Sequence, residues 1–139
     1  MLQRIQSIFM VCATACMIAI LFIPIGKLPH FQQLNVMEHT PLLMATLISI
    51  FFPIYNLFQF KRRKQQIRIC IYSILHYIIV MALAHYYVHE DPLTFSPAII
   101  LSKLTLGSLM PVAAIIFQIL AIRNIIKDDK LVRSMDRFR

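Results

Sequence analysis

This sequence lacks the short motifs that would indicate a particular reaction. It has no glycine-rich phosphate-binding loop, no nucleophile elbow and no His-Glu-x-x-His zinc motif, and its 139 residues include only two glycines. Its long apolar runs contain no Asp or Glu, which excludes the buried carboxylate that many proton- and sodium-coupled transporters use. No Gly-x-x-x-Gly pair is present to bring two membrane helices close together. The sequence therefore specifies no reaction and no coupled transport step.

Four long apolar runs make up most of the sequence. They cover residues 5–25, 41–60, 67–87 and 98–122. Each is about as long as a helix that crosses a hydrocarbon core of roughly 30 Å. The chain is 59% hydrophobic and 14% charged, and soluble helices rarely stay apolar over such lengths four times. We predict an all-α, four-span transmembrane helical bundle over residues 1–123, followed by a separate tail over residues 124–139.

The first run could be mistaken for a signal peptide, because Arg4 stands before it as a short positive region. Its apolar stretch is too long for that role, and Pro24-Ile25-Gly26-Lys27 is a poor cleavage site. We expect the run to be retained as a membrane span.

Proline marks the expected helix starts. Thr40-Pro41 and Ser96-Pro97 each combine a residue typical of a helix N-cap with a proline at the first helical position. Pro53 and Pro111 fall inside the second and fourth predicted spans.

Positive charge lies on one side of the predicted spans. The Lys and Arg residues of that side are Arg4, Lys61, Arg62, Arg63, Lys64, Arg68, Arg123, Lys127, Lys130, Arg133, Arg137 and Arg139. Only Lys27 and Lys103 fall on the other side. Because loops rich in Lys and Arg stay in the cytoplasm, we expect both termini and the Lys61–Arg68 loop to be cytoplasmic.

The net charge of +8 raises the question of partners. The basic residues flank membrane spans, so anionic phospholipids are the simpler partner and no nucleic acid is expected. The candidate contacts with lipid headgroups or a partner protein are Lys61, Arg62, Arg63, Lys64, Arg68, Lys127, Lys130, Arg133 and Arg137.

The tail after residue 123 is the second distinctive segment. At helical spacing its apolar residues fall on one side and most of its charges on the other, which predicts a short amphipathic helix. Such a helix would lie on the inner membrane surface or dock on a cytoplasmic partner. Asp129 and Arg133 are spaced for an ion pair along it. A solvated tail without fixed structure is the alternative.

Three polar residues inside the spans form a candidate intramembrane polar site: His76, Asn56 and Gln118. An ionisable group in mid-membrane is a functional candidate, and His76 could relay protons or contact a quinone. The structural alternative is a neutral histidine bonded to a neighbouring helix, with Asn56, Gln118 and Tyr77 as interhelical polar contacts.

A second candidate lies on the outer side. His85 and His89 are four residues apart, and Glu90 and Asp91 follow. With Glu38 and His39 from the other loop, these residues could hold zinc. The alternative is a set of polar interfacial residues at a helix end.

The three cysteines fall within or at the edge of predicted spans. Cys12, Cys16 and Cys70 are therefore expected to be small packing residues rather than disulfide partners. Palmitoylation of Cys70 or a soft metal site is the alternative.

Three cytoplasmic segments carry a family resemblance. They are Met1-Leu-Gln-Arg-Ile-Gln-Ser-Ile-Phe9, Arg63-Lys-Gln-Gln-Ile-Arg-Ile-Cys70 and the stretch from Ala121 to Arg139. Together they resemble the Bacteroidota integral membrane family catalogued as domain of unknown function 4293. The resemblance spans the chain, implies a four-span fold in the inner membrane, and transfers no catalytic residue. It also implies that the family's distinguishing sequence lies on the cytoplasmic face.

The function of the chain can be stated from the sequence only as an expectation. We expect a non-enzymatic protein without a cofactor: an accessory, scaffold or assembly subunit of an inner-membrane complex, acting through its basic loop and tail. Its partners would be anionic phospholipids and either a membrane protein or further copies of the chain. The alternative is a small-solute or ion transport component that works as an oligomer. A membrane enzyme acting on lipid at the outer histidines is a third class.

Overall fold

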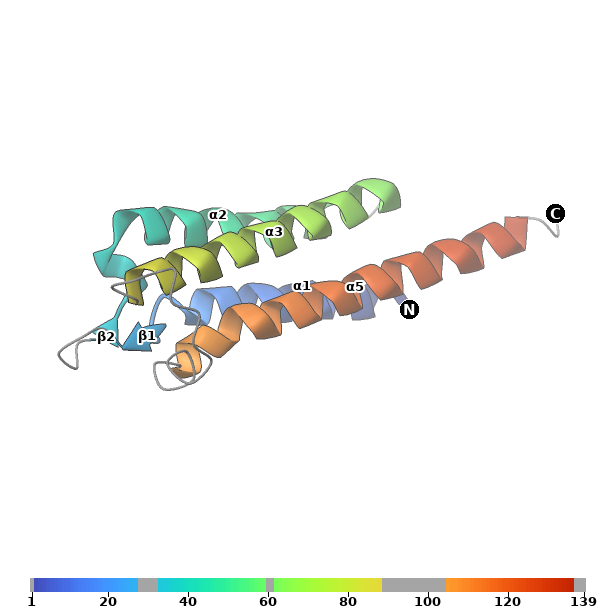
Figure 1. Cartoon of the computed structure of the whole chain (residues 1–139). Coiled ribbons are helices and arrows are strands. Elements are labelled where there is room, and N and C mark those ends of the chain that lie inside the picture. Colours follow the sequence, from blue (N-terminus) through green and yellow to red (C-terminus); the bar gives the residue numbers. More distant parts are fainter. Residues whose placement is uncertain (1, 28–32, 60–61, 89–104, 137–139) are drawn as a thin grey trace.

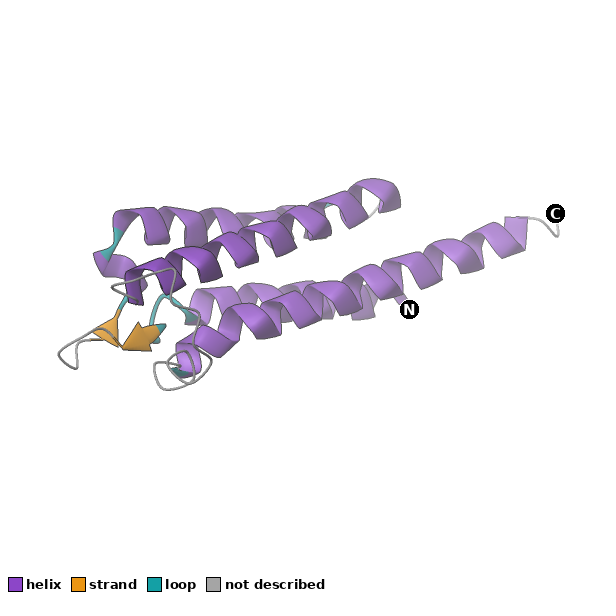
Figure 2. Cartoon of the chain, in the orientation of Figure 1, coloured by secondary structure: helices purple, strands orange, loops and turns teal. Residues whose placement is uncertain are grey.

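The computed structural model describes residues 2–27, 33–59, 62–88 and 105–136. The elements in chain order are α1 (Leu2–Ala19), β1 (Gly26–Lys27), β2 (Gln33–Leu34), the 3-10 helix η2 (Val36–Glu38), α2 (Thr40–Leu57), α3 (Arg63–Val88) and α5 (Leu106–Asp136). Figure 2 shows that the helices make up nearly all of this described part, with the two short strands at one end. The prediction of a helical bundle is confirmed.

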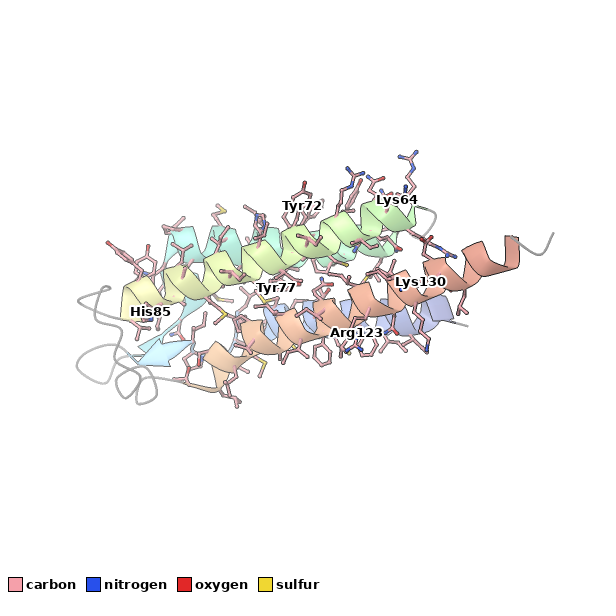
Figure 3. The ribbon with its side chains drawn as sticks, turned by 45° about the vertical axis from the view of Figure 1, so that its right-hand side comes forward. Lys64, Tyr72, Tyr77, His85, Arg123 and Lys130 are labelled. Atoms are coloured by element: carbon pink, nitrogen blue, oxygen red, sulfur yellow. The ribbon has the colours of Figure 1, made fainter. Side chains whose placement is uncertain are left out.

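The four long helices run alternately in opposite directions (Figure 1). Helix α1 packs against α2 and α5, and α3 packs against the same two helices, which closes a four-membered ring. The connection between α2 and α3 lies at the same end as both chain termini. We name this the basic end, because Lys64 and Lys130 lie there, and we name the opposite end, with β1, β2 and η2, the cap end (Figures 1 and 3).

The interior of the bundle combines large apolar residues, such as Met17, Leu42 and Tyr77, with small and polar ones. The small and polar buried residues include Ala13, Thr14, Thr46, Ser49, Cys70, Ser73, Ala114 and Ala121. The Oγ1 of Thr46 and the Oγ of Ser73 each donate to the carbonyl oxygen four residues earlier, at 2.8 and 2.9 Å. These hydroxyls are therefore satisfied within their own helices and allow the helices to approach closely.

The exterior is more apolar than the interior. Large side chains stand exposed along the helices, such as Phe58 at 75%, Phe51 at 62% and Ile8 at 58%. Helices α2 and α3 and the Leu106–Val132 part of α5 are long and apolar enough to cross a membrane, and Ile5–Ala19 of α1 is a shorter apolar helix. A largely apolar surface on helices of this length indicates a membrane protein.

Helix α1 ends earlier than the predicted span over residues 5–25. It stops at Ala19, and the next residues turn, with the amides of Phe22 and Ile23 donating to the Ala19 carbonyl oxygen at 3.1 and 3.0 Å. The apolar run continues because Ile20 and Ile25 are buried at the cap end, outside any helix. The apolar run of residues 5–25 thus predicted correctly that Ile20 and Ile25 are buried, but it predicted too long a helix α1.

A small non-helical cap closes this end of the bundle. Strands β1 and β2 pair antiparallel, with Gly26 opposite Leu34. Leu34 and Val36 are fully buried and join the core of Met17 and Val80. The Oγ1 of Thr105 donates to the Pro24 carbonyl oxygen at 2.7 Å, which fixes the start of α5 against the cap.

The other helix boundaries also differ in detail. Helix α3 begins at Arg63, so most of the predicted Lys61–Arg68 loop is helix. Helix α2 has His39 rather than Thr40 as its N-cap, without a side-chain cap bond, and Pro41 is in its first turn. Thr105 is not helical and α5 begins at Leu106, whereas residues 98–104 of the predicted span and the Ser96-Pro97 cap lie outside the described residues.

The predicted boundary between residues 123 and 124 does not coincide with a break in the helix. Helix α5 runs without interruption through it to Asp136 and contains no proline after Pro111. Ile125 is fully buried in a core cluster with Met10, Cys70 and Ala121. The tail is helical as predicted, but it continues the fourth long helix instead of forming a separate helix along a membrane surface. Figure 1 shows α5 projecting beyond the other three helices at the basic end.

Candidate functional site

The three candidate intramembrane residues do not form one site. Asn56, His76 and Gln118 each have partners of their own, and no hydrogen bond joins any two of them. Asn56 and Gln118 are fully buried, whereas His76 is only half-buried. The structure therefore places them in three separate environments.

Asn56 ties α2 to α3 near the basic end. Its Nδ2 donates to the Gln66 carbonyl oxygen at 3.1 Å and to the Cys70 Sγ at 3.0 Å. The Nε2 of Gln66 donates in return to the Asn56 carbonyl oxygen at 3.5 Å. These contacts hold the end of α2 against the first turns of α3, a structural role that the sequence alternative had allowed.

Gln118 ties α5 to α3 deeper in the bundle. Its Nε2 donates to the Tyr77 Oη at 3.4 Å, and its Oε1 is buried without a partner in the described part of the chain. Tyr77 is fully buried. Tyr77 was expected to serve as an interhelical polar contact, whereas the role of Gln66 was not predicted. A signal was present, because Gln66, Cys70, Ser73 and Tyr77 recur every three or four residues on one face of α3.

His76 faces away from this polar interior. Its Nδ1 lies 2.9 Å from the Tyr72 carbonyl oxygen one turn earlier, so an N–H at that nitrogen donates within the helix. Its ring packs on Phe52 of α2, with ring centroids 4.6 Å apart. His76 thus has a hydrogen-bond partner within its own helix and an aromatic neighbour on α2, whereas the structural alternative had expected a hydrogen bond to a neighbouring helix.

Arg63 forms ion pairs within the chain, although the sequence predicted that it contacts lipid headgroups or a partner protein. Its Nη2 lies 3.1 Å from the Asp128 Oδ2, and its Nη1 lies 3.9 Å from the Asp129 Oδ1. Asp129 had been expected to pair with Arg133 along the tail, but the side chain of Arg133 lies outside the described part. The pairing of Arg63 with two carboxylates joins the first turn of α3 to residues 124–136 of α5.

This ion pair makes a prediction for stability. Replacing Arg63 or Asp128 by alanine should each destabilise the bundle, with a coupling of about 1 kcal/mol in a double-mutant cycle, because both side chains are mostly buried. Thermal unfolding in detergent measures the four corners of the cycle. Arg62→Ala, which removes the neighbouring exposed cation, serves as control and should change stability by less than about 0.5 kcal/mol. Strictly additive losses would show that the two groups do not interact.

The remaining candidate contacts lie on the surface of the basic end. Those that the structure describes as exposed are Arg62, Lys64, Arg68, Lys127 and Lys130, and Arg123 is exposed with them. Figure 3 shows Lys64, Arg123 and Lys130 on the basic-end half of the bundle and His85 at the cap end. Lys61 and Arg137 lie outside the described residues, as does the side chain of Arg133.

The outer histidine cluster is only partly described. His39 stacks on Tyr87 with ring centroids 4.5 Å apart, so the start of α2 and the end of α3 do meet at the cap end. His89 and Glu90 lie outside the described residues. Among the residues that are described, no three His, Cys, Asp or Glu side chains are grouped as a metal would require. The prediction of a zinc site that includes His89 and Glu90 therefore stays a prediction.

The cysteines are free thiols in the described structure. Cys12 and Cys16 are half-buried, and Cys70 is buried, where it accepts the hydrogen bond from Asn56. Their positions agree with the expectation of small packing residues.

Comparison with known proteins places the chain in a family without assigning an activity to it. No curated protein and no solved structure matches this chain significantly. One family model, described as Domain of unknown function (DUF4293), matches residues 2–138. The match confirms the family resemblance carried by residues 1–9, 63–70 and 121–139. The chain therefore belongs to the DUF4293 family.

Proposed function

We propose that this chain is a four-span protein of the bacterial cytoplasmic membrane, with both termini in the cytoplasm. In this proposal it acts as a non-enzymatic accessory or assembly subunit, and residues 124–136 of α5 contact the partner. One observation carries the proposal. Helix α5 continues past the ends of the other helices as a charged segment, whereas the exposed surface of the bundle is mostly apolar.

The dimensions of the apolar exterior support a membrane position. The helical rise from Arg68 to His85 on α3 is about 26 Å, and that from Leu106 to Arg123 on α5 is also about 26 Å. Both are close to the roughly 30 Å of a bilayer's hydrocarbon core. The two aromatic residues Tyr86 and Tyr87 follow His85, where an aromatic belt would lie.

The distribution of charge supports the orientation. Exposed Arg and Lys residues are present on the first turns of α3 and the last turns of α5, which lie at one end of the bundle. An excess of Lys and Arg beside the spans favours the cytoplasmic side. Both termini would then be cytoplasmic, because they lie at that end as well.

Residues 124–136 of α5 support the subunit role. The Arg63 ion pairs involve Asp128 and Asp129, and Figure 1 shows α5 continuing past the ends of the other helices. Lys130 and Leu131 are exposed there, which combines charge and apolar surface on a rigid element. A rigid amphipathic helix that projects from a bundle suits docking to another protein.

Truncation after Asp129 tests this role, because it removes the exposed Lys130 and Leu131 and keeps both partners of Arg63. Removing all of residues 124–139 would also remove the buried Ile125 and both partners of Arg63, so the cut must fall beyond Asp129. We expect the full chain, purified from its native membranes in mild detergent, to carry a foreign membrane protein at fixed stoichiometry. The chain that ends at Asp129 should still reach the membrane fraction but purify alone.

Met37→Ala is the control for this experiment, because it alters an exposed apolar side chain at the cap end and should leave the association intact. Unchanged association of the truncated chain would remove the role of the α5 end. A full chain that purifies only as a monomer or homo-oligomer would remove the subunit proposal.

The transport alternative stays a prediction. It was based on three polar residues, His76, Asn56 and Gln118. Each of them has a different hydrogen-bond partner in the structure. No observation on the described residues favours it over the subunit role.

A further inference from the structure

Four exposed cations at the basic end form two matched pairs. Lys64 and Arg68 lie one helical turn apart on α3, and Arg123 and Lys127 lie one turn apart on α5. All four side chains are exposed, and none has an ion pair within the described part of the chain. The nearby carboxylates of Asp128 and Asp129 lie against Arg63 instead. These two pairs therefore present uncompensated positive charge.

The two pairs lie at the same depth along the bundle. Helices α3 and α5 are antiparallel neighbours, and the contact between Arg63 and Asp128 fixes their register at the basic end. Arg68 lies as many residues after Arg63 as Arg123 lies before Asp128. The two arginines are thus level to within about one helical turn of 5.4 Å, with Lys64 and Lys127 one turn farther out.

Each pair continues into an exposed apolar stripe on the same helix face. On α3 the stripe below Arg68 contains Ile71 and Leu75, and on α5 the stripe below Arg123 contains Ile119 and Ile116. At 100° per residue, each cation pair and its stripe occupy one side of the helix. A ligand that binds the cations would thus extend apolar chains along the stripe beneath them.

We propose that these pairs, Lys64 with Arg68 and Arg123 with Lys127, are two binding sites for the phosphate of anionic phospholipids, with the arginine at the boundary of the hydrocarbon and the lysine in the headgroup layer. A guanidinium binds phosphate oxygens through two parallel hydrogen bonds, and an ammonium one turn outward adds a second positive charge. A lipid supplies both the phosphate and the acyl chains that the stripes require, whereas an acidic protein would supply only the charge. The proposal rests on the membrane position proposed above.

The test compares two double variants with the same loss of charge. Arg68→Gln/Arg123→Gln removes both arginines of the proposed sites. Arg62→Gln/Lys130→Gln removes two exposed cations of the same end that belong to neither pair. Each protein is reconstituted into vesicles of phosphatidylcholine alone or of phosphatidylcholine with one quarter phosphatidylglycerol, and its thermal unfolding is followed. Flotation of the vesicles first establishes whether the chain is inserted.

For the unaltered chain, phosphatidylglycerol should raise the midpoint of unfolding by about 5 °C over phosphatidylcholine. The Arg68→Gln/Arg123→Gln variant should lose most of this shift and the control variant should keep it, while all three unfold alike in phosphatidylcholine because the altered side chains are exposed. An equal loss in both variants would show diffuse attraction and overturn the sites. So would the absence of any shift in the unaltered chain, or an equal shift caused by inorganic phosphate.

The experiment distinguishes failure of the proposed membrane position from failure of the proposed phospholipid sites. A chain that does not float with either vesicle would contradict the membrane position itself. A chain that floats with both vesicles, but whose stability does not depend on phosphatidylglycerol, would contradict only the phospholipid sites.

Discussion

Gly107→Ala is expected to destabilise the bundle by about 3 kcal/mol, although alanine is the better helix former. Gly107 is in the first turn of α5, where it lies against the non-helical backbone that follows α1. A Cβ at this position would overlap the Pro24 carbonyl oxygen and would lie 2.8 Å from the Pro24 carbonyl carbon and 3.0 Å from the Ile23 carbonyl oxygen. These are backbone atoms that cannot rotate away, so α5 or the cap must move.

Helix propensity and packing predict opposite signs for this substitution. Propensity alone would make alanine more stable by about 1 kcal/mol, so a loss of stability isolates the contact with the cap. The displacement would also disturb the bond from the Thr105 hydroxyl to the Pro24 carbonyl oxygen. Thermal unfolding in detergent measures the change. An unaltered or higher unfolding midpoint would mean that α5 does not begin against Pro24.

Gly26→Ala is the matched control, because it alters the other glycine of the chain, which lies at the same end. A Cβ at Gly26 would overlap the Val88 Cγ2, while the Cβ and Cγ1 of Val88 would lie 3.6 Å away. A valine side chain can change rotamer, so we expect a smaller loss, of about 1 kcal/mol. The two glycines are thus explained by the close approach of the cap to α3 and α5.

The sequence predicted the helices better than their ends. Helices α2 and α3 were located from apolar runs to within a few residues, because their hydrophobic stretches are bounded by polar or charged residues. The end of α1 was missed because apolar residues continue into the cap, where Ile25 is buried without being helical. Periodicity cannot separate a buried helix from a buried turn when both are apolar.

The change of polarity near Arg123 was misleading in the opposite way. It marks where the exposed residues of α5 change from apolar to charged, and it predicted a separate amphipathic tail where the helix continues. Charged residues such as Lys and Arg are good helix formers, so a helix can pass through such a boundary without interruption. Buried Ile125 and the Arg63–Asp128 contact support this continuation, and both depend on a neighbouring helix that local sequence does not reveal.

The candidate polar site was predicted by residue type and not by geometry. The sequence identified Asn56 and Gln118 as polar residues inside apolar runs, and both are fully buried. It could not say that Asn56 contacts Gln66 and Cys70 while Gln118 contacts Tyr77. Those partners depend on the rotation of α3 about its own axis, which is set by packing of the whole ring of helices.

Tyr77→Ala is expected to cost about 3 kcal/mol, the second large effect that the structure predicts. Tyr77 is the largest of the fully buried side chains, and it packs in the core cluster that contains Met17, Val80 and Ala114. Truncation would leave a cavity between α3 and α5 and would remove the only hydrogen bond that the structure gives to the Gln118 amide. Thermal unfolding in mild detergent measures the loss.

Two companion variants divide this effect into its causes. Tyr77→Phe keeps the ring and removes the hydroxyl that lies 3.4 Å from the Gln118 Nε2, so it should cost about 1 kcal/mol. Tyr72→Ala truncates the same residue type on the exposed side of α3 and should cost less than about 0.5 kcal/mol. Equal losses for Tyr72→Ala and Tyr77→Ala would mean that α3 turns another face to the bundle. In that case Lys64 and Arg68 would no longer lie above an exposed apolar stripe, and the proposed phospholipid site on α3 would lose its structural basis.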